Sequence, residues 1–352
     1  MMRWCLCLVV LIGLAGTAAA GLTSQGGAKV QARLASELKK VEGLLAQSRY
    51  AEAARAAERL VRRFKNEFLA WMALAHCHIQ EWPLRNDQRA EEAAEQCVLL
   101  KGREPPVLLV LVKTKLRQSK FDEVLALVEE LLPHPAIRSA PETTAELLTM
   151  RATVHQRQGA LDPQALKKAA EDLELARTLS PRNVGVLISS AELHIHEQRY
   201  EEARVELEAA VAISPGQKRV HSLLVTCYRH KKDPEKVKLH YEILTLLNRL
   251  VDSVALTNAP KEEERFEILR KLAVKNPTDF EHRMQLAVVL WRRGESPAAL
   301  KEIDEILKIA PIHQGARLLR AQVESGAGPD EEEGEEESEP GEDADKDGDS
   351  CP

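Results

Sequence analysis

The stretch NVGVLISSAELHIHEQRYEEARVELEAAVAISP, residues 183–215, reads as two short amphipathic helices joined by a brief connector. In its first half Leu187 and Ala191 recur at the spacing of one helical face, and in its second half Ala203 and Leu207 do the same. Either helix alone would leave its apolar face in water. The stretch is therefore a helical hairpin that needs neighbours on both sides.

The hairpin recurs at a fixed interval along the chain. Pro181 and Pro215 are 34 residues apart, and Pro277 and Pro311 are separated by 34 residues again. Proline ends a helix because it lacks a backbone N–H and clashes with the preceding turn. Hairpins that end at a constant interval indicate a repeat architecture in which successive units bury each other's apolar faces.

A second copy, FEHRMQLAVVLWRRGESPAALKEIDEILKIAP at residues 280–311, identifies the repeat more closely. The 34-residue period, with Ala-rich helix pairs and a closing proline, resembles the tetratricopeptide repeat family. Ala287, Gly294, Ala299 and Pro311 stand where that family has its small packing residue, turn glycine, second-helix alanine and closing proline. The resemblance identifies the fold but indicates almost nothing about the ligand.

The predicted fold is all-α, a right-handed α-solenoid of stacked helix-turn-helix repeats with a capping helix and a disordered acidic tail. The composition agrees, with 44% hydrophobic, 4% aromatic and 30% charged residues. We expect the solenoid to span residues 30–325 with about seven to eight units, and residues 312–323 to form the capping helix. Residues 250–277 are irregular. The interval from Pro215 to Pro277 is six short of two periods, which predicts a lengthened helix or a shortened unit.

The first 20 residues have the pattern of a secretory signal peptide. Arg3 precedes an apolar run at residues 4–15, and small residues up to Ala20 provide a cleavage site. The run is shorter than the roughly 20 apolar residues that a spanning helix needs, so no stable membrane span is expected after cleavage. A retained signal anchor stays an alternative. Residues 21–29 are interpreted as a loose leader, and the mature chain is expected to be extracytoplasmic, either periplasmic or secreted.

Residues 326–352 differ in character from the rest of the chain. Between Asp330 and the end there are 13 acidic residues against one Lys. Such a segment cannot bury enough apolar surface to fold, so a disordered tail is expected. The full chain has a net charge of −6, but without the tail and Arg3 the folded part carries about +5. A tail that only keeps the protein soluble is an equally open interpretation.

The resemblance also implies where a partner would bind. In the family, the first helices of successive units line a concave surface that takes extended or helical peptides. The matching inward polar positions are His76, Gln80, Lys113, Arg117, Glu192, His196, Thr226, His230 and Arg292. Most are basic or neutral donors, which favours an acidic protein or peptide partner held by charge-assisted hydrogen bonds. The acidic tail could compete for this groove, and ordinary solvated helix faces remain the alternative interpretation.

Metal sites are weakly indicated. DADKDGD at residues 343–349 resembles the opening of an EF-hand loop, but the sequence ends before the bidentate Glu, so at most weak calcium association is expected. Histidines two apart, as in His194 and His196, point away from each other on a helix. His196 and His230 could meet across adjacent first helices, although further ligands are not identified.

Export would permit a disulfide between Cys77 and Cys97, which lie in the two helices of one unit. Spacing alone cannot establish the geometry of such a bridge, and buried free thiols are favoured for these two residues and for Cys227. Cys351, in the tail, is the better candidate for pairing between molecules.

No zinc-protease histidine pair, phosphate-binding glycine loop or nucleophile elbow is present, so neither enzymatic activity nor a cofactor is expected. The leading hypothesis is an exported protein–protein interaction scaffold that binds a partner segment in its concave groove, within an envelope assembly. The alternative is that the acidic tail binds cations or basic partners, with the solenoid as its carrier. Nucleic acid is not an expected partner of an exported chain with a net acidic total.

Overall fold

The computed structural model describes residues 25–326, except for residues 48, 80–85, 160–161 and 256–261. The predicted signal peptide, the first residues of the leader and the acidic tail lie outside the described residues. The described part forms 17 helices and no strand, which confirms the predicted all-α solenoid class. None of its helices is long and apolar enough to cross a membrane.

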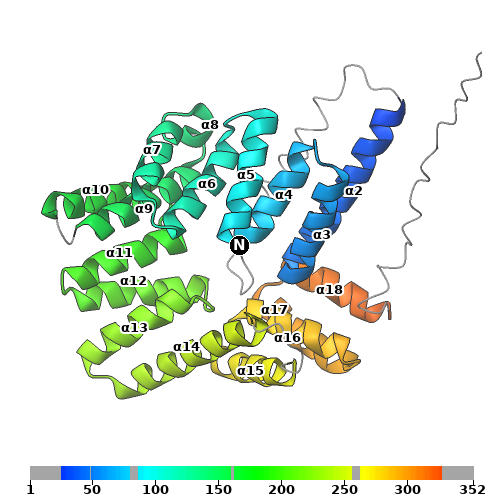
Figure 1. The fold of residues 1–352 in the computed structure, drawn as a ribbon. Coiled ribbons are helices and arrows are strands. Elements are labelled where there is room, and N and C mark those ends of the chain that lie inside the picture. Colours follow the sequence, from blue (N-terminus) through cyan, green and yellow to red (C-terminus); the bar gives the residue numbers. More distant parts are fainter. Residues whose placement is uncertain (1–24, 48, 80–85, 160–161, 256–261, 327–352) are drawn as a thin grey trace, which may run out of the picture.

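The helices follow one another as antiparallel hairpins (Figure 1). In chain order they are α2 (Gln25–Ala46), α3 (Tyr50–Arg63), α4 (Phe68–Ile79), α5 (Asp87–Lys101), α6 (Pro105–Arg117), α7 (Phe121–Leu131), α8 (Pro135–Arg138), α9 (Pro141–Gln158), α10 (Pro163–Leu179), α11 (Val184–His196), α12 (Tyr200–Ile213), α13 (Lys218–Lys231), α14 (Pro234–Ala255), α15 (Glu262–Lys275), α16 (Phe280–Arg292), α17 (Ser296–Ile309) and α18 (Gln314–Glu324).

Local sequence signals set the helix boundaries. The side chains of Asn183 and Asp162 accept hydrogen bonds from the first turns of α11 and α10, as N-caps do. Within four of the hairpins the chain reverses through a left-handed residue at the same place: Ser119, Gln198, Lys232 and Gly294, with φ of 59°, 62°, 60° and 77°. Only at the last position does a glycine relieve the strain of that conformation.

The hydrophobic core is divided along the stack and has no single centre. One cluster extends from Leu34 in α2 to Val154 in α9, others occupy the middle hairpins, and a further cluster joins α14 to α18. Helices of one hairpin pack on each other and then on the next hairpin. This serial packing is what the repeat pattern predicts.

Two features differ from a regular array. Helix α14 has 22 residues, which confirms the lengthened helix expected from the short interval between Pro215 and Pro277. Helix α2 begins at Gln25, five residues before the predicted start of the solenoid, so helix replaces part of the expected loose leader. The predicted capping helix is α18, which begins at Gln314.

The stack is curved toward its first helices. Successive first helices pack directly on one another, as α4 does on α6, α9 on α11 and α11 on α13, whereas no such packing joins successive second helices among the described residues. The face formed by the first helices is therefore the concave one. The curvature continues until α18 lies against α2 (Figure 1).

The two ends of the solenoid touch and close it into a ring. Gln47 donates a hydrogen bond of 3.0 Å to Gln322 at this closure. Tyr50 donates one of 2.7 Å to Glu281 of α16. Gly315 lies so near the end of α2 that a Cβ atom there would be 1.9 Å from the carbonyl oxygen of Ala46. The predicted capping helix thus covers the first hairpin and does not end an open stack.

Candidate functional site

The groove predicted from sequence maps to the last two turns of α4, α6, α11, α13 and α16. Of its nine residues, Gln80 lies outside the described residues. The others divide into a buried residue, residues paired within the protein, and residues that face solvent.

His76 is the buried one. Its relative exposure is 8%, and burial together with the positive charge of Lys113 lowers the pKa of its imidazole to about 4. A histidine held neutral and shielded from water belongs to the packing of α4, so a partner has little access to it.

Four predicted residues form ion pairs with other parts of the chain. Lys113 of α6 lies 2.7 Å from Glu146 of α9, and Glu192 of α11 pairs with Arg219 of α13. Both pairs therefore cross from one first helix to the next, which helps to fix the spacing of the concave face.

The other two are Arg117 and Arg292. Arg117 donates to the carboxylate of Asp87 at 3.0 Å and to the carbonyl of Ile79 at 2.9 Å. Arg292 of α16 pairs with Glu52 of α3 across the ring closure. The predicted groove is thus occupied at its last unit by the first hairpin of the same chain.

The solvent-facing residues lie on α11 and α13. His196 and His230 are exposed, and Thr226 is half-buried. The ring of His230 stacks on that of Tyr200, with 3.6 Å between centroids and 10° between planes. This stack orients the imidazole of His230 against Tyr200.

Arg157, which is not among the residues predicted from sequence, is exposed in the last turn of α9. It occupies the position that other first helices also give to a basic residue, namely their last or penultimate one. We name this set the basic ladder: Arg117, Arg157, His196, His230 and Arg292. Counting back from each helix end would have found Arg157. A helix C-terminus carries partial negative charge, so the ladder also stabilises the helices that bear it.

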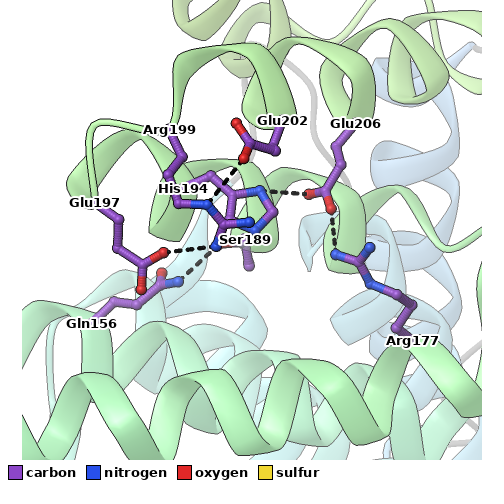
Figure 2. Close-up of polar contacts among 8 residues, drawn as sticks. All are labelled: Gln156, Arg177, Ser189, His194, Glu197, Arg199, Glu202 and Glu206. Carbon is purple, nitrogen blue, oxygen red and sulfur yellow. Dashed lines mark hydrogen bonds and ion pairs between the residues drawn. The ribbon is translucent and has the colours of Figure 1, made fainter.

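Polar contacts join the middle helices to one another (Figure 2), and we call the residues that make them, Gln156, Arg177, Ser189, His194 and Glu206, the polar seam. Gln156 of α9 donates a 2.8 Å hydrogen bond to the carbonyl of Ser189 in α11. Glu206 of α12, with 7% relative exposure, pairs with Arg177 of α10, and its other oxygen lies 3.8 Å from Nδ1 of His194. The seam connects α9 to α12, so it helps to fix the spacing of Arg157 and His196.

The buried polar side chains of His221, His240 and Asn276 form hydrogen bonds between different segments of the chain. His221 donates through Nε2 to the carbonyl of Pro215 at 2.7 Å, which leaves its Nδ1 to accept from His240 at 3.0 Å. Asn276 donates to the same carbonyl at 2.7 Å. The described residues contain no group of three metal-ligating side chains close enough to hold an ion.

Cys77, Cys97 and Cys227 are buried and form no disulfide, so the bridge considered between the first two is not formed. Burial raises the pKa of the Cys77 thiol to about 12 and that of Cys97 to about 12. Thiols with so little thiolate are poor nucleophiles, so these residues serve the packing of their helices.

Comparison with solved structures finds helical-repeat proteins. The chain is similar to the APC/C hetero-tetramer Cut9–Hcn1 (13% identity, 82% of this chain and 55% of that chain, TM-score 0.45). It is similar to a human IFIT1 dimer with m7Gppp-AAAA (14% identity, 75% of this chain and 68% of that chain, TM-score 0.46). It is also similar to a tetratricopeptide repeat protein from Parabacteroides merdae (10% identity, 83% of this chain and 98% of that chain, TM-score 0.39). The chain spans about half (55%) of the first of these. At such identities the likeness concerns the fold alone.

No curated protein sequence matches this chain. Two family profiles do match it: residues 38–98 and residues 160–239 each match a profile of the tetratricopeptide repeat. The second match contains the hairpin at residues 183–215, whose pattern recurs through the solenoid. This chain therefore contains tetratricopeptide repeats in both of these regions.

Proposed function

We propose that this protein is an exported, non-enzymatic scaffold that binds an acidic segment of another protein on its concave face, between α9 and α13. The tetratricopeptide-repeat fold supports a role in protein–protein interaction. The basic ladder supports the acidic character of the partner, because a row of donors along one face suits a row of carboxylates.

The single observation that carries the proposal is that the end residues of the basic ladder are paired within the chain, whereas its middle residues are exposed. Arg117 and Arg292 are paired within the chain, whereas Arg157 and His196 are exposed on neighbouring first helices. No ion pair involves Arg157 within the described part of the chain. Two adjacent donors on helices whose spacing is fixed by the polar seam form a preorganised site, which lowers the entropy cost of binding.

Export is part of the same proposal and rests on residues 1–20, which have the charged start, apolar run and small-residue end of a signal peptide. An envelope assembly is the setting we propose for the partner. Expression of the full chain in a native host, followed by fractionation and N-terminal sequencing, tests this part: a mature chain that begins at Gly21 supports export, and an intact Met1 in the cytoplasm contradicts it.

The binding site is tested with a fluorescent poly-glutamate peptide and two matched double variants of the full chain. Arg157→Gln with His196→Gln removes the accessible part of the ladder. Lys167→Gln with Lys168→Gln removes two exposed cations from α10, a second helix. A hydrogen bond to a charged group contributes about 1.5–3 kcal/mol, so the ladder variant should bind about tenfold or more weakly at low salt.

The control variant should bind within about twofold of the unaltered chain, since screened charges away from the site contribute little. Equal weakening by both variants would mean that the peptide responds to overall charge and not to the concave face. Unchanged binding by the ladder variant would exclude this site.

A further inference from the structure

The positive charge of the folded part is concentrated in its first hairpin. Residues 25–67 contain ten Lys and Arg against five Glu, whereas residues 68–326 contain 37 basic and 37 acidic residues. The first hairpin, α2 and α3, therefore carries the whole basic excess of the solenoid.

Part of that charge forms a continuous row on α3. Arg55, Arg59, Arg62 and Arg63 are spaced at i, i+4, i+7 and i+8, so they share one face of the helix. All four are exposed, and they lie opposite the buried face that contains Ala57. We call these four arginines the α3 stripe.

The α3 stripe has few acidic partners within the described part of the chain. Arg55, Arg59 and Arg63 form no ion pair there, and Arg62 approaches Glu58 only at 4.0 Å with 79% of its side chain exposed. The exposed Arg103, in the loop between α5 and α6, is by contrast paired, at 2.6 Å from Glu130. Uncompensated like charges side by side on a helix repel each other, which makes the stripe a site for a polyanion.

The ring closure brings the start of the acidic tail to this hairpin. Gln322, in the last turn of α18, is hydrogen-bonded to Gln47 just before α3 begins, and α18 ends at Glu324. The sequence continues for 28 residues beyond Glu324, and a flexible chain of that length has an end-to-end distance of about 29 Å. Helix α3, with 14 residues, is only about 21 Å long. The tail can therefore reach the stripe without any change in the ring.

We propose that the acidic segment at residues 330–349 binds in cis to the α3 stripe. Thirteen carboxylates at the end of a short tether meet an unpaired row of four guanidinium groups. The tether gives the segment an effective concentration of about millimolar, so pairs that are individually weak suffice for occupancy. The same contact strengthens the ring closure, because it joins the segment after α18 to the hairpin that α18 covers.

The test is zero-length carbodiimide crosslinking of the full chain followed by peptide mass spectrometry. The reagent joins a carboxylate to a lysine amine that touches it. Tail carboxylates should couple chiefly to Lys65, which follows the stripe, and to Lys39 and Lys40 of α2. Raising the salt to 0.5 M should reduce this coupling at least fivefold, since surface charges are then screened within a few ångströms.

Two matched variants isolate the stripe. Replacing all four arginines by glutamine (R55Q, R59Q, R62Q, R63Q) keeps helix propensity and should reduce coupling at least fivefold. The same change of charge elsewhere, in K167Q, K168Q, K271Q and K301Q, should leave coupling within about twofold. If the stripe variant fails to fold, the salt dependence in the unaltered chain decides the question.

Coupling of the tail chiefly to Lys113 or Lys218 would place it on the concave face and overturn the proposal. So would unchanged coupling in the stripe variant. Crosslinks that join isotopically light to heavy chains in a mixture would show that the tail binds a second copy, which also contradicts binding in cis. None of these readouts depends on the acidic partner proposed for the basic ladder.

Discussion

Glu206 is a buried carboxylate whose cost of burial is offset by neighbours from two other helices. Arg177 of α10 pairs with it, and His194 of α11 lies 3.8 Å away (Figure 2). The pair joins second helices of neighbouring hairpins, which do not pack extensively on each other. A single side chain thus contributes to the spacing between repeats.

Removal of that charge should destabilise the protein. Because Arg177 is partly exposed, the loss is smaller than for a fully buried pair, and Glu206→Gln should lower the free energy of unfolding by about 1–3 kcal/mol. The control is Glu202→Gln, which breaks the exposed pair with Arg199 and should leave the free energy of unfolding almost unchanged. Urea denaturation measures both. Equal losses would show that Glu206 has no special role.

His240 should make stability depend on pH. Burial and the charges of His221 and Lys236 lower its pKa to about 4, although Glu208 acts in the opposite direction. In the unfolded chain the pKa is about 6.5, so the unfolded state takes up the proton first as pH falls. The contribution of a neutral His240 is complete above pH 6.5 and is lost between about pH 6.5 and pH 4, by at most about 3 kcal/mol.

His240→Gln retains a hydrogen-bond donor without the ionisation. The free energy of unfolding of this variant, measured by urea denaturation at several pH values, should therefore fall less steeply between pH 6.5 and pH 4. Part of the decline should persist, since burial also lowers the pKa of His76 to about 4. Parallel curves for the variant and the unaltered chain would contradict the assignment.

At the scale of an element, α18 is the helix on which ring closure depends. Gly315 lets its first turn approach the end of α2, where any Cβ would collide with the backbone of Ala46. A backbone group cannot move aside as a flexible side chain does. Gly315 is therefore required for a close approach of two helices and not for an unusual backbone conformation.

Gly315→Ala should push α18 away from α2 and lower the free energy of unfolding by about 1–3 kcal/mol, as overpacking does. Gly43→Ala is the matched control, since Gly43 lies in α2 with nothing within 4 Å of the added atom, and alanine there should be neutral or stabilising. Hydrogen exchange at the amides of α18 is the measurement. Faster exchange in both variants, or in neither, would contradict the role given to Gly315.

Across the whole molecule, the closed ring restricts access to the concave face. Arg49 lies over the ring of Trp291 at 6.0 Å, Tyr50 binds Glu281, and Glu52 pairs with Arg292. Burial alone would raise the pKa of Glu52, but hydrogen bonds from Arg49 and the charge of Arg292 hold it below its usual range. The last unit of the solenoid is thus covered by the first hairpin and opens only if these contacts break.

Tyr50→Ala combined with Glu52→Ala removes two of the closing contacts and should open the ring. Small-angle X-ray scattering should then show a larger radius of gyration and a longer maximum dimension than for the unaltered chain. The control Lys167→Ala with Lys168→Ala changes exposed side chains of α10, away from the closure, and should leave both quantities unchanged. An unchanged radius in the Tyr50 and Glu52 variant would mean that other contacts suffice for closure.

Helical hairpins, their 34-residue interval and the long helix α14 could all be read from the sequence, because apolar spacing and proline positions act over one or two turns of helix. The ladder was predictable to the same extent: His196 and His230 follow from their place at helix ends, and Arg157 has the same signal. The pairing of Lys113 with Glu146, or of Arg292 with Glu52, could not be read in this way.

Closure of the ring joins Tyr50 to Glu281, 231 positions apart in the chain. Whether such distant units meet depends on the small rotation between each hairpin and the next, summed over the whole stack. That rotation is set by the sizes of side chains at every interface between hairpins. It therefore cannot be predicted from the spacing of residues within one hairpin. The repeat and its helices are local properties of the chain, whereas the closed ring and the covered last unit arise only when all the hairpins are packed together.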